Sequence, residues 1–163
     1  MTQIQPSEAA PTGQGTDYER TVRVAASPDV LFDAVTTAAG ITAWWTPTTG
    51  SGAAGGTLEL SFDPPEPCVF HVDETTRPTS VRWSVIACSF LTDWVGTQPV
   101  FTFVPIDHAT TDVHFRHHGL TSDLDCIDMC SNGWNHFLDS LRAYAETGLG
   151  MPRLSPEDEA RRQ

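Results

Sequence analysis

The chain has 163 residues, a formal net charge of −12, nine arginines and no lysine. A chain of this length is expected to form one domain around one core. Its acidic balance repels phosphate backbones and argues against nucleic acid as a partner, and the missing lysine excludes Schiff-base and P-loop lysine chemistry. No apolar run approaches the ~18 residues that span a bilayer, so no membrane partner is expected.

The amino terminus predicts a disordered leader over residues 1–16, because this segment is rich in Gln, Pro, Gly, Ala and Thr. Residues 1–15 hold neither a cation nor an apolar run, so they are not a secretory signal. The folded domain is expected over residues 17–150, followed by a polar tail over residues 151–163.

Residues 17–26 predict a first strand. Ser27 and Pro28 then suit the N-cap and first position of a helix that Gly40 would end. A second short helix is expected over residues 41–45, and residues 46–56 read as a loop with neither helical nor strand periodicity.

Four or five strands are expected next, because apolar and polar residues alternate in several short runs separated by turn residues. The runs lie at residues 58–62, 68–73, 81–86, 101–103 and 113–117. This alternation is typical of an antiparallel sheet with one covered face.

Residues 123–148 predict one long amphipathic helix. At about 100° per residue, its apolar side chains fall within an arc of about 120°. They are Cys126, Cys130, Trp134, Phe137, Leu138, Leu141, Tyr144 and Ala145. The element order predicts an α+β fold with this helix against one face of the sheet, and a hollow between a long helix and a curved sheet can bind a ligand.

Several motifs resemble the helix-grip superfamily, the START-like or SRPBCC group, and within it the homologues of the heat-shock ATPase activator. They are Ser27 to Phe32, Gly40-Ile41 with Trp44-Trp45, Gly55-Gly56, Trp94 to Thr97, His117 to Leu120, and the closing Trp134 to Leu138, Ser140-Leu141, Tyr144 and Glu146 to Gly148. The resemblance spans roughly residues 16–152. It implies a curved antiparallel sheet wrapped around a long C-terminal helix, with two short helices after the first strand.

The group includes lipid carriers, hormone receptors, aromatase/cyclases and co-chaperones. The eukaryotic activators carry a further partner-binding domain, for which this chain is too short.

The four cysteines, Cys68, Cys88, Cys126 and Cys130, lie within or beside apolar patterns. They predict buried thiols in a reduced, cytoplasmic protein rather than a disulfide framework. Cys126 and Cys130 lie on the same face of the helix, and cysteine thiolates are common zinc ligands. His136 projects about 120° around the helix from Cys130, so it cannot join the two cysteines at one zinc ion. A packing role is therefore expected for both thiols, with no metal and no cofactor.

The strand around residues 113–118 places His117 on the inward face and His114 and His118 on the outward face. An inward histidine could orient a ligand or act as a general base, or simply hydrogen-bond a neighbour. Trp94, on a loop, could be a lid residue or a loop plug.

The inward aromatic residues predict the lining of a cavity for an apolar or aromatic ligand, with Trp44 and Trp45 near its entrance. The expected lining is Trp44, Trp45, Trp83, Phe101, Phe103, Phe115, His117, Cys130 and Trp134.

Small-ligand binding is the leading functional hypothesis. One alternative is a cyclase/dehydratase-type enzyme in which His117 moves a proton, although no catalytic motif is recognisable. The other is a co-chaperone-like module that binds a protein partner through the loop at residues 46–56. A homodimer is a further possibility.

Overall fold

The computed structural model describes residues 16–62, 66–89 and 91–162. The leader expected over residues 1–16 lies, apart from Thr16, outside these ranges. The described elements, in chain order, are β1 (Asp17–Val24), α1 (Pro28–Thr36), α2 (Ala38–Trp44), β2 (Thr48–Gly50), β3 (Thr57–Leu60), β4 (Cys68–Thr76), β5 (Ser80–Ala87), the 3₁₀ helix η2 (Thr92–Trp94), β6 (Gln98–Asp107), β7 (Thr110–Thr121), α3 (Ile127–Thr147) and α4 (Pro156–Arg161).

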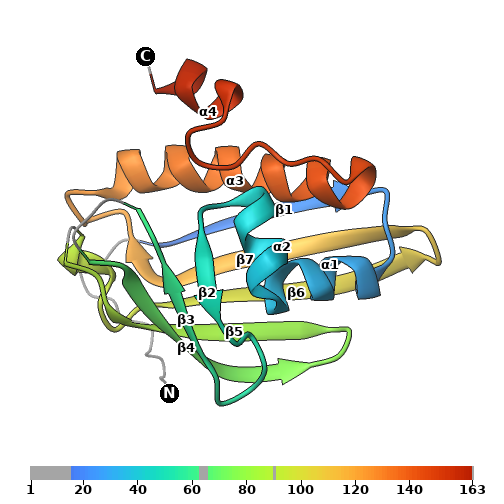
Figure 1. The fold of residues 1–163 in the computed structure, drawn as a ribbon, viewed down its shortest axis with the longest axis horizontal. Helices are drawn as coiled ribbons and strands as arrows, with labels where there is room; N and C mark the ends of the chain where they lie inside the picture. Colours follow the sequence, from blue (N-terminus) through green and yellow to red (C-terminus); the bar gives the residue numbers. More distant parts are fainter. Residues whose placement is uncertain (1–15, 63–65, 90, 163) are drawn as a thin grey trace, which may run out of the picture.

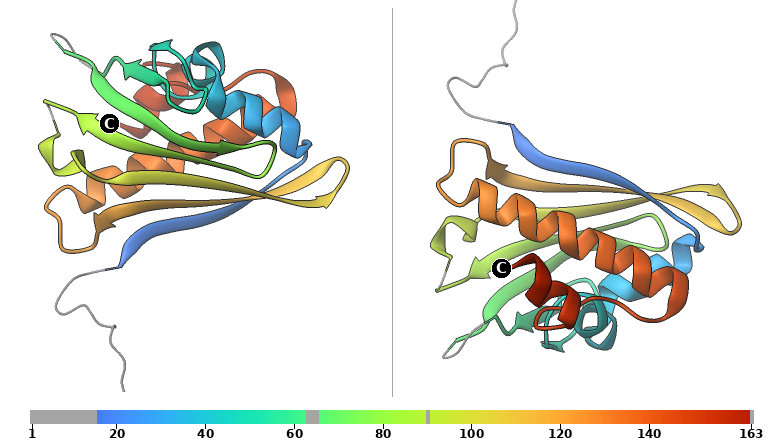
Figure 2. Two further views of the ribbon diagram at one scale, coloured as in Figure 1. Left: turned by 90° about the horizontal axis from the view of Figure 1, so that it is seen from below. Right: turned by 90° about the horizontal axis from the view of Figure 1, so that it is seen from above.

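The strands form one curved antiparallel sheet in the order β1-β7-β6-β5-β4-β3-β2 (Figure 1). Helices α1 and α2 carry the chain from one edge strand, β1, to the other, β2. Helix α3 runs along the inner face of the sheet (Figure 2). The α+β helix-grip architecture expected from the sequence is confirmed.

Side-chain hydroxyl groups cap the N-termini of the two short helices, α1 and α2. The backbone N–H of Val30 donates to Ser27 Oγ at 3.3 Å, and Pro28 occupies the first turn of α1. Helix α1 ends at Thr36 rather than at Gly40, because the Thr37 hydroxyl accepts from the N–H of Gly40 at 3.0 Å and caps a new helix. The second helix therefore begins three residues earlier than the sequence indicated.

The loop expected over residues 46–56 contains a short strand, β2, that pairs with β3. Thr48 anchors it, because its N–H donates to Thr42 Oγ1 and its hydroxyl donates to the carbonyl of Thr46. Thr46 and Thr48 are both buried. Three residues are too short a strand for an alternating pattern to reveal.

Helix α3 buries one face against the sheet, with Trp134, Leu138 and Leu141 among its most buried residues. It ends at Gly148, whose φ of 84° is the left-handed conformation that glycine adopts without strain. Among the described residues, no helix has the length and apolar character needed to cross a membrane.

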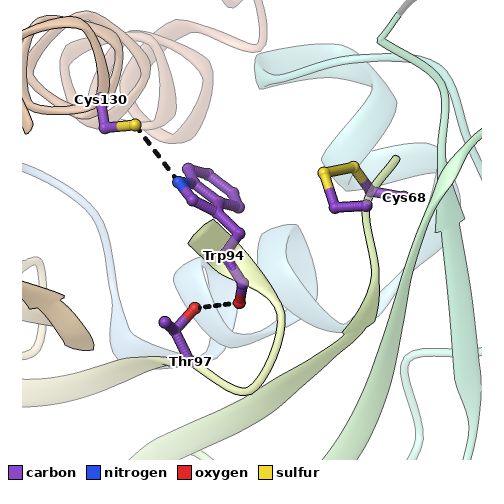
Figure 3. The surroundings of a disulfide bond; sticks show 5 residues. Cys68, Trp94, Thr97 and Cys130 are labelled. Carbon is purple, nitrogen blue, oxygen red and sulfur yellow. Dashed lines mark hydrogen bonds between the residues drawn. A yellow bond between two sulfur atoms is a disulfide. The ribbon is translucent and has the colours of Figure 1, made fainter. Parts of the chain in front are cut away.

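The expectation of four reduced cysteines is wrong for two of them. Cys68 and Cys88 form a disulfide, with their Cα atoms 4.3 Å apart (Figure 3). Val69 pairs with Ala87 across the antiparallel strands β4 and β5, which places the two flanking cysteines opposite each other. This pairing depends on strand register, which the spacing of the cysteines does not reveal. Cys126 and Cys130 remain free and buried.

The C-terminal segment folds back along α3 and ends in α4 (Figures 1 and 2). The N–H of Arg153 donates to the carbonyl of Trp45 at 2.6 Å, and the guanidinium of Arg161 lies 5.2 Å from the ring centre of Phe137. Asp158 is fully buried and accepts from the N–H of Leu154 and from Arg161 Nε, both at 2.9 Å. Burial alone would raise the pKa of Asp158, but these donors lower it below its ordinary value.

Replacing Asp158 with Asn is expected to loosen this segment. The change removes a charged acceptor from two donors, at a cost of about 1 to 3 kcal/mol. Amide hydrogen exchange should accelerate over residues 154–162 while α3 stays protected. The exposed Glu157→Gln is the matched control; equal exchange in both variants would contradict the anchoring role of Asp158.

Candidate functional site: an aromatic pocket at the start of helix α3

An apolar pocket of about 140 Å³ opens between the first turns of α3, the η2 segment and the end of β3. It is lined by Trp45, Phe62, Leu91, Trp94, Met129, Cys130, Gly133, Trp134 and Phe137. A dry cavity of ~150 Å³ with apolar walls is large enough to take up benzene. The pocket therefore fits one aromatic ring or an aliphatic group of similar size.

Trp45 is the centre of the aromatic wall. Its ring centre lies 4.8 Å from that of Trp134, 5.6 Å from that of Phe62 and 6.4 Å from that of Phe137. The Trp94 ring is parallel to that of Trp134 within 2°, at 6.0 Å. Broad aromatic faces from the C-cap of α2, from η2 and from α3 thus converge on one small space.

Gly133 forms part of the pocket in the middle of the 21-residue helix α3. Apart from its chain neighbours and the backbone of its own helix, a Cβ atom added at Gly133 would meet no atom within 4 Å, so close packing does not require glycine here. Glycine inside a helix costs about 1 kcal/mol relative to alanine. Its effect at this position is to leave the space of the pocket open.

His117 lies behind the pocket wall in a fully satisfied hydrogen-bond chain. Trp134 Nε1–H donates to His117 Nδ1 at 3.0 Å, and His117 Nε2 lies 2.7 Å from Thr97 Oγ1. The Thr97 hydroxyl donates to the carbonyl of Trp94 at 2.6 Å, so it accepts from His117 Nε2–H. The chain fixes the neutral Nε2–H tautomer and ties η2, β7 and α3 together.

The protonation state of His117 agrees with this geometry. Its side chain is fully buried, and this burial lowers its pKa to about 3. Both ring nitrogens are engaged, and His117 is absent from the pocket lining. It therefore acts as a neutral structural link, in a poor position to exchange protons with a guest in the pocket.

The sequence-predicted lining residues divide into two groups. Three of them line the pocket: Trp45, Cys130 and Trp134. The other six are buried at sites outside its lining: Trp44, Trp83, Phe101, Phe103, Phe115 and His117. Trp44 donates from Nε1 to the carbonyl of Ala34 at 2.8 Å, while Trp83 packs edge-on against Phe101.

Sequence reasoning did not assign five of the lining residues to the site: Phe62, Leu91, Met129, Gly133 and Phe137. Two signals were available: Phe137 was inside the predicted apolar arc of the long helix, and Phe62 ended the alternating run at residues 58–62. Trp94, considered as a lid or a plug, is a buried wall residue whose Nε1–H donates to Cys130 Sγ at 3.2 Å (Figure 3). Burial and the adjacent Cys126 thiol raise the pKa of Cys130 to about 12.

A second polar cluster lies on the outer face of the sheet. The Ser84 hydroxyl donates to Asp73 Oδ2 at 2.5 Å, and His71 Nδ1 lies 2.8 Å from Asp73 Oδ1. Burial would raise the pKa of Asp73, but the Ser84 and His71 hydrogen bonds lower it. The carboxylate lies between the other two groups, so the histidine is not placed to activate the serine as it is in a nucleophilic triad.

The comparisons with known structures agree with the fold. The solution structure of the Aha1 dimer from Colwellia psychrerythraea matches with a TM-score of 0.72 and 28% identity, over 83% of this chain and 99% of that one. CalU16 from Micromonospora echinospora matches with a TM-score of 0.63 and 18% identity, over 88% and 79%. PFC0360w, an HSP90 activator from Plasmodium falciparum, matches with a TM-score of 0.62 and 21% identity, over 78% and 94%.

No curated protein matches the chain. A family model does: the one described as "Activator of Hsp90 ATPase homolog 1-like protein" matches residues 25–146. This match covers α1, the sheet from β2 to β7 and nearly all of α3. The chain therefore belongs to the family of proteins like activator of Hsp90 ATPase homolog 1, within the SRPBCC helix-grip group.

Proposed function

We propose that the protein binds a small apolar or aromatic ligand in the pocket between α3, η2 and the end of β3. The observation that carries this proposal is Gly133, which leaves an apolar space open at a cost in helix stability. The aromatic side chains of Trp45, Trp94 and Trp134 would contact the guest over broad faces. The size of the pocket favours a ligand that inserts a single ring.

Filling the pocket from Gly133 is the sharpest test. Benzene and indole serve as probes, and their binding is followed by the fluorescence of the pocket tryptophans and by the shift in melting temperature. We expect the wild-type protein to bind at least one probe and Gly133→Leu to lose affinity by at least about tenfold, because the leucine side chain would occupy the space. A Gly133→Ala variant should gain up to about 1 kcal/mol in helix stability.

Asn132→Leu is the matched control, because it places the same leucine side chain at an exposed position next to Gly133 and outside the pocket lining. It should bind the probes as the wild-type protein does. Unchanged binding in Gly133→Leu would show that the probes bind elsewhere. A wild-type protein that binds neither probe would count against the proposal.

The cyclase/dehydratase alternative receives less support from the geometry. Its proton-transfer group would be His117, whose two nitrogens are held by Trp134 and Thr97. A base in that position would have to break both hydrogen bonds before it could reach a substrate.

A helper module for a protein partner is the second candidate function, and family membership favours it. The similar chains include an Aha1 dimer and an HSP90 activator. The test measures whether the purified protein changes the ATPase rate of an Hsp90-type chaperone. Sedimentation velocity of the purified protein gives its own oligomeric state. An unchanged rate would remove this candidate.

A further inference from the structure

The Cys68–Cys88 disulfide lies between two walls of the pocket. Cys68 is paired across the sheet with Leu60, and Phe62, two residues after Leu60, lines the pocket. On the other side, the N–H of Leu91 donates to the carbonyl of Cys88 at 3.2 Å, and Leu91 lines the pocket as well. The disulfide therefore connects the wall at the end of β3 with the wall that precedes η2.

The wall that contains η2 is held at its two ends. The N–H of Trp94 donates to the carbonyl of Leu91 at 3.1 Å, so two successive turns lead from Cys88 to Trp94. Beyond η2, the N–H of Gly96 donates to the carbonyl of Val85 at 2.9 Å. A 3₁₀ helix of three residues has few hydrogen bonds of its own, so its position depends on these two attachments.

The sheet does not depend on the disulfide for its strand pairing. Strands β4 and β5 are already paired along their length, from Val69 opposite Ala87 to Thr76 opposite Ser80. The backbone hydrogen bonds of this ladder remain when the sulphurs separate. Loss of the disulfide should therefore act on the η2 wall and leave the fold in place.

We propose that the Cys68–Cys88 disulfide is a redox-sensitive restraint on the pocket, which holds Leu91 and η2 in place when oxidised and releases them when reduced. This inference rests on the proposed function of the pocket. A released wall offers a ligand fewer fixed contacts, and ordering that wall on binding costs free energy. The reduced protein therefore binds the ligand more weakly than the oxidised protein.

Reduction requires an external dithiol. One thiolate of the dithiol attacks a sulphur of the disulfide, the S–S bond breaks and a mixed disulfide forms. The second thiol of the dithiol then displaces the protein sulphur and becomes part of a cyclic disulfide. Two electrons and two protons pass from the dithiol to Cys68 and Cys88, which end as two thiols.

The burial of the disulfide couples its reduction to the pocket. Cys68 is fully buried and Cys88 is 2% exposed, whereas Ala87 and Ser89 on either side of Cys88 are exposed. A reductant therefore reaches the sulphurs through local opening at this strand end. A ligand that contacts Leu91 and keeps the wall in place lowers the population of the open state. Ligand binding should thus slow the reduction, just as reduction weakens ligand binding.

The other two cysteines take no part in this exchange. Cys126 and Cys130 are free and buried. Burial raises the pKa of Cys130 to about 12, so this residue holds almost no thiolate at neutral pH. Figure 3 shows the disulfide on one side of the Trp94 indole and Cys130 on the other.

The test compares the oxidised wild-type protein with the same protein after anaerobic treatment with dithiothreitol, and intact mass confirms the gain of two hydrogen atoms. Reduction should accelerate amide hydrogen exchange over residues 91–97 by at least about tenfold, while the second half of α3 stays protected. It should also weaken the binding of indole, the probe, by at least about fivefold. Saturating indole should slow the reduction.

A Cys68→Ala/Cys88→Ala variant should show the fast exchange and weak indole binding of the reduced protein, and dithiothreitol should not change it further. Cys126→Ala, which removes a thiol outside the disulfide and the pocket lining, should respond to dithiothreitol as the wild-type protein does. Equal exchange over residues 91–97 in the oxidised protein, the reduced protein and the double variant would overturn the inference. Equal indole affinity in the two redox states would overturn it as well.

Failure of this inference is distinguishable from failure of the proposed function. If neither indole nor benzene binds in either redox state, the proposed function of the pocket is contradicted. The exchange experiment needs no ligand, so it still decides whether the disulfide restrains the η2 wall.

Discussion

Replacing His117 with alanine is expected to destabilise the protein by about 3 to 5 kcal/mol. The change removes a fully buried ring and leaves the indole N–H of Trp134 without its acceptor. It also removes the His117 Nε2–H that donates to the Thr97 hydroxyl. That hydroxyl in turn donates to the carbonyl of Trp94, so the two hydrogen bonds link β7 to the η2 segment. Equilibrium urea unfolding at pH 7.5, followed by circular dichroism, measures the loss.

His114→Ala is the control for this substitution, because His114 lies on the same strand but on the exposed face. We expect it to change the free energy of unfolding by no more than about 0.5 kcal/mol. A similar small loss in His117→Ala would show that the hydrogen-bond chain contributes little to stability.

Lowering the pH from 7.5 to 5 is expected to cost the wild-type protein about 2 kcal/mol through His117 alone. Burial lowers the pKa of His117 from 6.5 to about 3 in the folded protein. Between these values the unfolded chain binds a proton that the native protein does not, so the free energy of unfolding falls as the pH falls. The slope approaches about 1.4 kcal/mol per pH unit below pH 6.5.

A glutamine at position 117 isolates this effect, since His117→Gln removes the titrating group while retaining a donor and an acceptor. Its unfolding free energy should fall by about 2 kcal/mol less than that of the wild-type protein over the same pH range. Asp17, Asp73 and Asp158 have lowered pKa values, so the stability they contribute is lost only below about pH 3.8. An identical pH profile in His117→Gln and wild type would contradict the assignment.

The alternating strands and the apolar arc of the long helix were enough to predict the layers of this fold. A strand with alternating residues has one buried face, so the inward direction of His117 follows from Val113 and Phe115 alone. The helix arc likewise identified Trp134 and Phe137 as inward residues. These features are local, because they depend only on the period of each element.

The pocket could not be predicted in the same way. Inward residues either pack against one another or border a space, and local periodicity does not distinguish the two. Phe101 and Phe115 lie 4.9 Å apart between ring centres in the core, while Trp45 reaches the pocket because α2 ends beside α3. Gly133 gave no signal, since an open space is visible only when the surrounding elements are in place.

By itself, the sequence determined the order of the longer elements, the buried face of each and the membership of the helix-grip group, because these depend on residue period and short motifs. Only the tertiary structure decided which cysteines pair, where the C-terminal segment docks and what holds His117. Cys68 meets Cys88 through strand register, the N–H of Arg153 donates to the carbonyl of Trp45, and His117 contacts Trp134 and Thr97 from distant elements. Each of these contacts joins segments whose relative position is set by the packing of the whole domain.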